Sequence, residues 1–124
     1  MEIFNEYVVE IFDILLESFP IPQRFDTHKL VQERGEVNCR LFKETIRFLI
    51  HEGFITGKVN IAVHPDIDDL RLTSKGLAIL ESVPHSLEGK KTFSQRIKEV
   101  ANSSSKQIAP SLVTEFIKYS VLNT

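Results

Sequence analysis

Asn-Cys-Arg-Leu-Phe-Lys-Glu-Thr-Ile-Arg-Phe-Leu-Ile-His-Glu-Gly-Phe-Ile, residues 38–55, is the stretch that decides the predicted fold. Asn38 is a favourable N-cap residue, because its side-chain oxygen can accept a hydrogen bond from a free N–H of the first helical turn. Gly53 can adopt the left-handed conformation that ends a helix. On a helical wheel the apolar residues in between cover roughly 200° of arc. We therefore expect the central helix of the fold, packed from two sides, with one basic strip in water.

A second helix is predicted just before this one, over residues 26–35. Only Glu36 and Val37 separate it from Asn38, so the two segments form a helix-turn-helix candidate. An N-terminal helix is predicted over residues 2–18, where apolar residues recur at helical spacing.

Extended segments flank the helix pair. Gln23–Phe25 predicts a short strand, and residues 54–63, rich in branched side chains, predict a longer one with Gly57 as a bulge or bend. A return strand follows at residues 70–72. The sequence thus predicts an α+β fold, with a three-helix core and a small antiparallel β-hairpin near residues 54–72.

Two segments carry a family resemblance. "LIHEGFI", which ends the central helix, and "LRLTSKGLAIL", where the last strand enters a helix beginning after Thr73, resemble the winged helix-turn-helix family of small bacterial regulators. The resemblance covers about residues 1–83 and implies a helix that reads the major groove of DNA. Winged helices also serve as protein-docking modules, so it implies a fold more specifically than a function.

The C-terminal part predicts further helices. Thr92 with Gln95 is a capping-box signature, and a last helix is predicted over residues 111–122, near Pro110. We therefore divide the chain into a winged-helix domain (1–83), a linker (84–92) and a helical extension (93–124). The segment "LTSKGLAILESVPHSLEGKKTFSQRIKEVA" is similar to small uncharacterised bacterial and prophage-type proteins, which implies no activity.

Composition limits the classes of protein. The 124 residues are enough for a hydrophobic core without disulfides or metals, and no apolar stretch approaches the roughly 18 residues that span a bilayer. One cysteine, Cys39, and an acidic N-terminal segment predict a cytoplasmic protein. Residues 1–19 carry a net charge of −5 and residues 89–124 a net charge of +4, which could attract within a chain or between two chains.

Catalytic and metal-binding patterns are lacking. The four histidines have no ligand-like spacing, and the chain has no CxxC, HExxH, GxSxG or phosphate-binding glycine loop. Residues 64–69 put one histidine and three aspartates in a turn, but lack the glycine and distal glutamate of a calcium loop, so we interpret them as a solvated acidic turn. Cys39 is interpreted as a small, partly buried residue. We expect no enzyme activity, no cofactor and no metal.

Double-stranded DNA is the partner that the central helix suggests. Arginine can contact guanine in bidentate fashion, and lysine attracts phosphate. The candidate DNA-binding residues are Asn38, Arg40, Lys43, Glu44, Arg47 and His51 on this helix and Lys58 on the following strand. Against DNA binding, the hairpin tip carries Asp66, Asp68 and Asp69, and the isoelectric point near 6.1 is not basic.

A non-catalytic protein-interaction or dimerisation module is the alternative. Helices 2–18 and 38–52 both have apolar arcs of roughly 200° or more, which exceeds what a three-helix core usually covers. This excess predicts a homodimer through helices 2–18 and 111–122.

Overall fold

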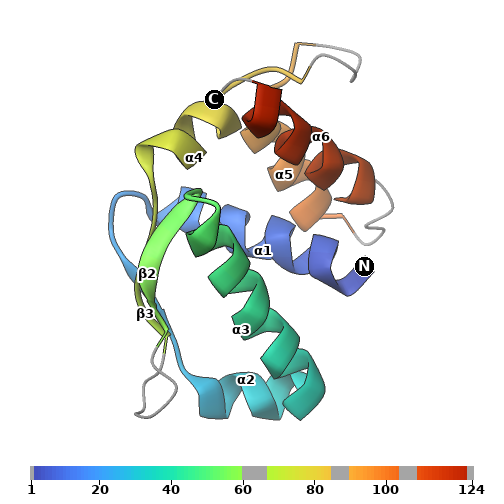
Figure 1. Ribbon diagram of the computed structural model, residues 1–124. Coiled ribbons are helices and arrows are strands. Elements are labelled where there is room, and N and C mark those ends of the chain that lie inside the picture. Colours follow the sequence, from blue (N-terminus) through green and yellow to red (C-terminus); the bar gives the residue numbers. More distant parts are fainter. Residues whose placement is uncertain (1, 60–66, 85–89, 104–108, 123–124) are drawn as a thin grey trace.

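The computed structural model describes residues 2–59, 67–84, 90–103 and 109–122. These residues form an α+β fold of six helices and one three-stranded antiparallel sheet (Figure 1). In chain order the elements are α1 (Glu2–Ser18), β1 (Gln23–Phe25), α2 (Thr27–Arg34), α3 (Glu36–His51), β2 (Ile55–Val59), β3 (Ile67–Leu72), α4 (Ser74–Leu80), α5 (Phe93–Ala101) and α6 (Ala109–Leu122).

Helix α3 forms where a helix is predicted, but it begins two residues earlier, and α1, which packs on α3, α5 and α6, is the central helix of the fold instead. Its N-cap is Gly35, whose φ of 84° and ψ of 165° are a conformation that is essentially restricted to glycine. The same residue ends α2, donating its N–H to the Val31 carbonyl, and its own carbonyl accepts the N–H of Cys39 at 3.0 Å. Asn38 therefore lies inside the first turn of α3, and its prediction as the N-cap is wrong.

The sheet has the order β1-β3-β2, and both pairings are antiparallel. Val59 pairs with Ile67 and Ile55 with Leu72, which confirms the predicted hairpin. The register shifts between Thr56 and Lys58, so that Gly57 lies opposite an extra residue of β3. A Cβ atom on Gly57 would lie 2.3 Å from Cδ2 of Leu70 and 3.3 Å from the Asp68 oxygen, so a side chain here would require the buried Leu70 side chain to move.

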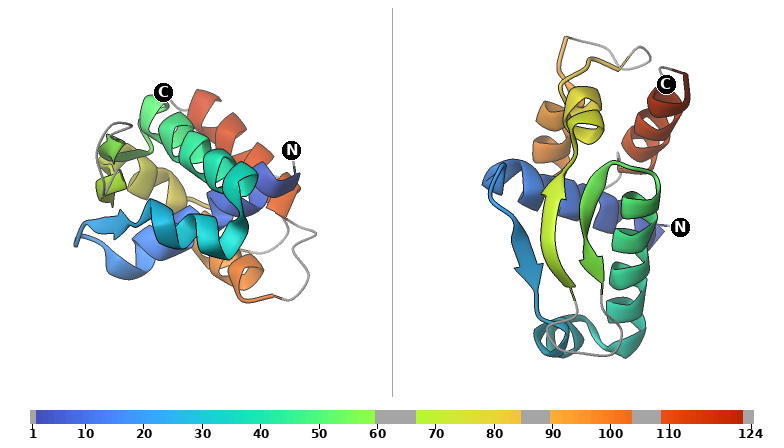
Figure 2. Two further views of the ribbon diagram at one scale, coloured as in Figure 1. Left: turned by 90° about the horizontal axis from the view of Figure 1, so that it is seen from below. Right: turned by 60° about the vertical axis from the view of Figure 1, so that its left-hand side comes forward.

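Helix α1 lies between two groups of elements (Figure 2). One side packs on α3, where rings of Phe4 and Phe48 and rings of Tyr7 and Phe42 meet edge to face. The other side packs on α5 and α6, where Phe12 lies 4.9 Å from Phe116, ring centroid to ring centroid. The C-terminal helices therefore share one hydrophobic core with α1 and α3.

The two segments that carry the family resemblance contact each other. Thr73 caps α4, and its Oγ1 also donates to the Gly53 carbonyl at 2.5 Å, just beyond the end of α3. Gly76 lies against the next carbonyl, since a Cβ atom there would be 2.1 Å from the Phe54 oxygen. Lys75 donates to the Glu52 carbonyl at 3.0 Å. This junction fixes the return of the chain from the hairpin to the end of α3.

Other predicted boundaries agree with the structure to within a few residues. Helix α1 has its predicted bounds, β3 begins at Ile67 instead of residue 70, and α4 ends at Leu80 instead of near Val83. The capping box of Thr92 and Gln95 is present at the start of α5. Residues 60–66, which include the last four residues of the predicted strand and half of the predicted hairpin tip, lie outside the described residues. The division at residues 84–92 stays a prediction. None of the described helices is long and apolar enough to cross a membrane.

Candidate nucleic-acid interface

An arginine next to the turn between α2 and α3 stabilises the position of the two helices. Arg34, the last residue of α2, forms an ion pair with Glu10 of α1. Its guanidinium carbon lies 4.5 Å from the ring centre of Phe42 on α3 and 5.1 Å from that of Tyr7 on α1. Because this half-buried cation of α2 contacts both α1 and α3, it fixes α2 relative to α3 more firmly than an exposed pair would.

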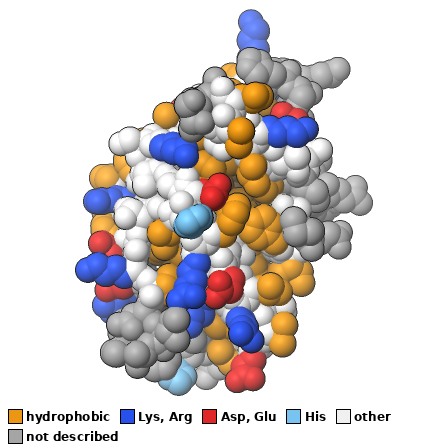
Figure 3. Space-filling view, viewed as in Figure 1, with side chains coloured by type: hydrophobic (Ala, Val, Ile, Leu, Met, Phe, Trp, Pro, Cys, Tyr) orange, Lys and Arg blue, Asp and Glu red, His pale blue; other side chains and the backbone are white. Residues whose placement is uncertain are grey.

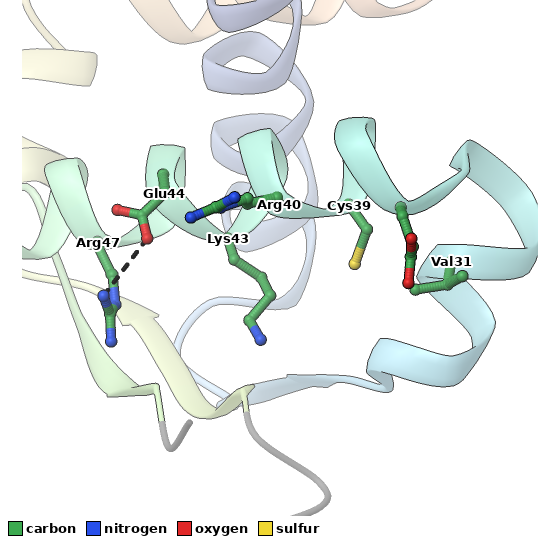
Figure 4. A pocket seen from close by; sticks show the side chains of 7 residues that line it. Val31, Cys39, Arg40, Lys43, Glu44 and Arg47 are labelled. Atoms are coloured by element: carbon green, nitrogen blue, oxygen red, sulfur yellow. Dashed lines mark hydrogen bonds and ion pairs between the residues drawn. The ribbon is translucent and has the colours of Figure 1, made fainter. Parts of the chain in front are cut away.

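One face of α3 lines an open hollow of about 400 Å³. Lys43, Arg47 and the thiol of Cys39 extend from the helix to the same side (Figure 4). Cys39 itself is buried, which agrees with its predicted structural role. The hollow is lined by Val31, Glu36, Cys39, Arg40, Lys43, Glu44 and Arg47.

The charges in this hollow are mixed. Three cations, Arg40, Lys43 and Arg47, stand with two carboxylates, Glu36 and Glu44, which gives a net charge of +1. Nη1 of Arg47 lies 3.4 Å from Oε1 of Glu44, three residues earlier on the same helix. Both side chains are largely exposed, so this pair contributes only a few tenths of a kcal/mol, about 0.3–0.5, and can be exchanged for another partner.

The structure brings together four of the seven predicted site residues: Arg40, Lys43, Glu44 and Arg47. The other three do not line the hollow. Asn38 is half-buried in the first turn of α3, His51 is exposed at its last residue, and Lys58 is exposed on β2, opposite Asp68 of β3.

In the described part of the hairpin, a nearby arginine partly balances the negative charge of the aspartates. Nε of Arg24, on β1, lies 3.4 Å from Oδ1 of Asp68, and this hydrogen bond lowers the pKa of Asp68 below its usual 3.8, with the Asp69 N–H and the charge of Lys58 adding to the effect. Asp69 is exposed and has a positive φ of 57°. Asp66 lies outside the described residues.

Two contributors to the interface were missed in the sequence. With Asn38 predicted as the cap, Glu36 falls in a turn, so the prediction leaves its carboxylate off the basic face. Arg24 lies 44 residues from Asp68, and nothing in local spacing connects them. Only the alternation of Gln23–Phe25, which puts Arg24 on the open side of a predicted edge strand, could have suggested it.

The structure removes the reason for predicting a homodimer through helices 2–18 and 111–122. The apolar surfaces of α1 and α6 that seemed in excess pack on each other within one chain, where Phe12, Leu112 and Phe116 are all buried. The acidic and basic ends also meet within the chain, since Glu17 of α1 forms an ion pair with Lys98 of α5.

Metal binding and relatives add nothing to the assignment. In the described ranges, no group of three or more histidine, cysteine or carboxylate side chains is placed to hold a metal ion. Comparison of the chain with protein-family models, with curated proteins and with solved structures finds no match.

Proposed function

We propose that this protein is a DNA-binding winged-helix protein, a candidate transcriptional regulator, which inserts α3 into the major groove. In this proposal α2 and α3 are the helix-turn-helix and the β2–β3 hairpin is the wing. The order α1, β1, α2, α3, β2, β3 and the sheet order β1-β3-β2 support the assignment of the scaffold.

One observation carries the proposal. Arg40, Lys43 and Arg47 project from a single face of the second helix of the pair, next to an open hollow. The first half of such a helix is the part that reaches base edges in helix-turn-helix proteins, and arginine is the side chain best suited to guanine. The Arg24–Asp68 pair supports the proposal too, because it reduces the repulsion that an acidic hairpin would exert on phosphate.

The test is the affinity for a labelled random-sequence duplex, measured by fluorescence anisotropy at several salt concentrations. We expect K43A to weaken binding to all sequences and to flatten the salt dependence by about one phosphate contact. Once a preferred sequence is selected, R40A, which removes the arginine in the first half of α3, should cost about 1–3 kcal/mol on it.

Lys118→Ala is the matched control, because Lys118 is an exposed cation on α6, away from the hollow. Equal effects of K118A and K43A would show only non-specific attraction. Absence of binding at low salt would refute the proposal.

A second candidate function is a non-catalytic protein-interaction module on the same scaffold, without DNA binding. Val37 and Leu41 favour it, since both are apolar and exposed on α3, next to the charged residues. A duplex offers no apolar surface of that kind in its phosphate backbone. This function would be favoured if the protein binds no duplex at low salt and still requires α3 for association with a protein.

A further inference from the structure

Helix α3 carries two parallel columns of exposed and half-buried side chains. At about 100° per residue, Val37, Leu41 and Phe48 fall within roughly 40° of one another around the helix. Val37 is 74% exposed and Leu41 is 42% exposed, and Phe48 is half-buried against Phe4 of α1. Beside this apolar column runs a charged column of Glu36, Arg40, Glu44 and Arg47. Figure 3 shows apolar and charged side chains next to each other on this open face.

The charged column is self-complementary when it is read in opposite directions. In two antiparallel helices related by a two-fold axis, each column of one helix faces the same column of the other. With the axis close to Leu41, Arg40 of one copy lies level with Glu44 of the second, and Glu36 lies level with Arg47. At a rise of 1.5 Å per residue, the members of each pair are level to within about 2 Å.

The apolar column has matching partners in the same arrangement. Leu41 faces Leu41 of the second copy, and Val37 faces Phe48. We therefore propose that two copies of this chain pair through antiparallel α3 helices, with an apolar contact bordered by four reciprocal ion pairs. A parallel arrangement would instead put Arg40 level with Arg40 and Glu44 level with Glu44, which like charges disfavour.

A second copy matches the mixed charges of this face. A duplex would meet the carboxylates of Glu36 and Glu44, whereas a second copy covers both carboxylates with arginine. The weak Arg47–Glu44 pair within each helix is available to join this network. Since about 20 Å of one helix makes the contact, the interface falls in the small, transient class, and we expect a dissociation constant in the micromolar range.

The test is the solution mass of the full chain, measured by analytical ultracentrifugation from about 1 to about 300 µM, a range that brackets a micromolar equilibrium. Wild type should shift from monomer to dimer. R40E should raise the dissociation constant at least about tenfold, because it puts two carboxylates level with each other at both of the symmetry-related Arg40–Glu44 pairs. R40E/E44R exchanges the charges and should restore the wild-type constant to within about threefold, if the two positions contact each other.

Lys118→Glu, a charge reversal on an exposed part of α6, is the matched control and should leave the constant unchanged. Arg40 and Glu44 are exposed, so the variants should keep the helical circular-dichroism spectrum of wild type. A wild type that stays monomeric throughout would overturn the proposal. So would a dimer that R40E leaves intact, or one that R40E/E44R fails to restore. None of these measurements contains DNA, so their outcome is independent of the proposed DNA binding.

Discussion

At the scale of single residues, Gly76 is the position that least tolerates a side chain. It lies in α4 against the end of α3, and a Cβ atom would come within 2.1 Å of the backbone oxygen of Phe54. Alanine is favoured over glycine inside a helix by about 1 kcal/mol, but overpacking against backbone costs more. We expect G76A to lower the free energy of unfolding by about 2–3 kcal/mol in urea denaturation. Ser74→Ala, at an exposed position of the same helix, should change it by less than about 0.5 kcal/mol, and an equally small effect of G76A would contradict the close contact.

Two acidic residues on α1 should affect stability in opposite directions. Burial raises the pKa of Asp13 above its usual 3.8, although Lys98 opposes the shift. The folded state then holds this proton more tightly than the unfolded state, so stability decreases as the pH rises from 3.8 through the raised pKa. The ion pair with Lys98 lowers the pKa of Glu17 below 4.5, so its contribution is present above pH 4.5 and is lost as the pH falls through the lowered pKa.

Neutralising each side chain separates the two effects. We expect D13N to raise the midpoint of thermal unfolding at pH 7, because it removes a carboxylate whose charged form is disfavoured, and E17Q to lower it. Both differences should disappear well below pH 3.8, where the carboxyl groups are protonated in both states. The same sign for the two variants at pH 7 would mean that Asp13 is governed by Lys98 and not by burial.

At the scale of elements, the start of α3 can be tested by comparing Asn38, the predicted cap of α3, with Asp26, the observed cap of α2. Asp26 caps α2, with Oδ1 accepting the His28 N–H at 2.9 Å, so D26A should cost about 1 kcal/mol of unfolding free energy. Asn38 lies in the first turn of α3 and caps nothing, so N38A should be neutral to slightly stabilising, by at most about 0.5 kcal/mol. Urea denaturation of both variants gives the comparison. A loss of about 1 kcal/mol in N38A would restore Asn38 as the cap.

The sequence predicts the elements well where they depend on residues that are close in the chain. The prediction fails where an element depends on a backbone conformation or on a contact between residues that are distant in the chain. Apolar periodicity locates α1, and capping residues locate α5, because both depend on neighbours along the chain. The predicted start of α3 is wrong because Asn38, a favourable cap residue, lies three residues after Gly35, which is the actual cap. The positive φ of Gly35 cannot be recognised from the sequence. For the candidate site, the helical wheel brought Arg40, Lys43, Glu44 and Arg47 together correctly. Arg24 and the packing of α6 on α1 depend on tertiary contacts that periodicity does not contain.

At the scale of the whole molecule, Phe116 joins the C-terminal helices to the rest of the core. Its ring centre lies 4.9 Å from those of Phe12 and Phe54 and 5.5 Å from that of Phe93, so it connects α1, the end of α3 and α5. F116A should therefore lower the free energy of unfolding by about 3–5 kcal/mol. Val121→Ala, an exposed change on the same helix, should alter it by less than about 0.5 kcal/mol.

The same contacts predict the behaviour of a shortened chain. Residues 1–83 alone would leave the face of α1 around Val8, Val9 and Phe12 without its cover from α5 and α6. We expect this fragment to lose the cooperative thermal transition of the full chain. A fragment that unfolds cooperatively would instead support the predicted independent domain of residues 1–83.

The proposed pairing through α3 and the proposed binding of DNA through α3 exclude each other, because both would use Arg40 and Arg47. Self-association should therefore weaken apparent DNA affinity once the protein concentration exceeds the dimer dissociation constant, since only the unpaired fraction can bind. L41S removes an apolar contact of the pairing column without changing charge. At high concentration we expect L41S to occupy more duplex than wild type in anisotropy titrations, and at nanomolar concentration the two curves should coincide. Higher occupancy by wild type only above the dimer dissociation constant would mean that DNA binds the dimer, and that the two proposed activities use different faces of the molecule.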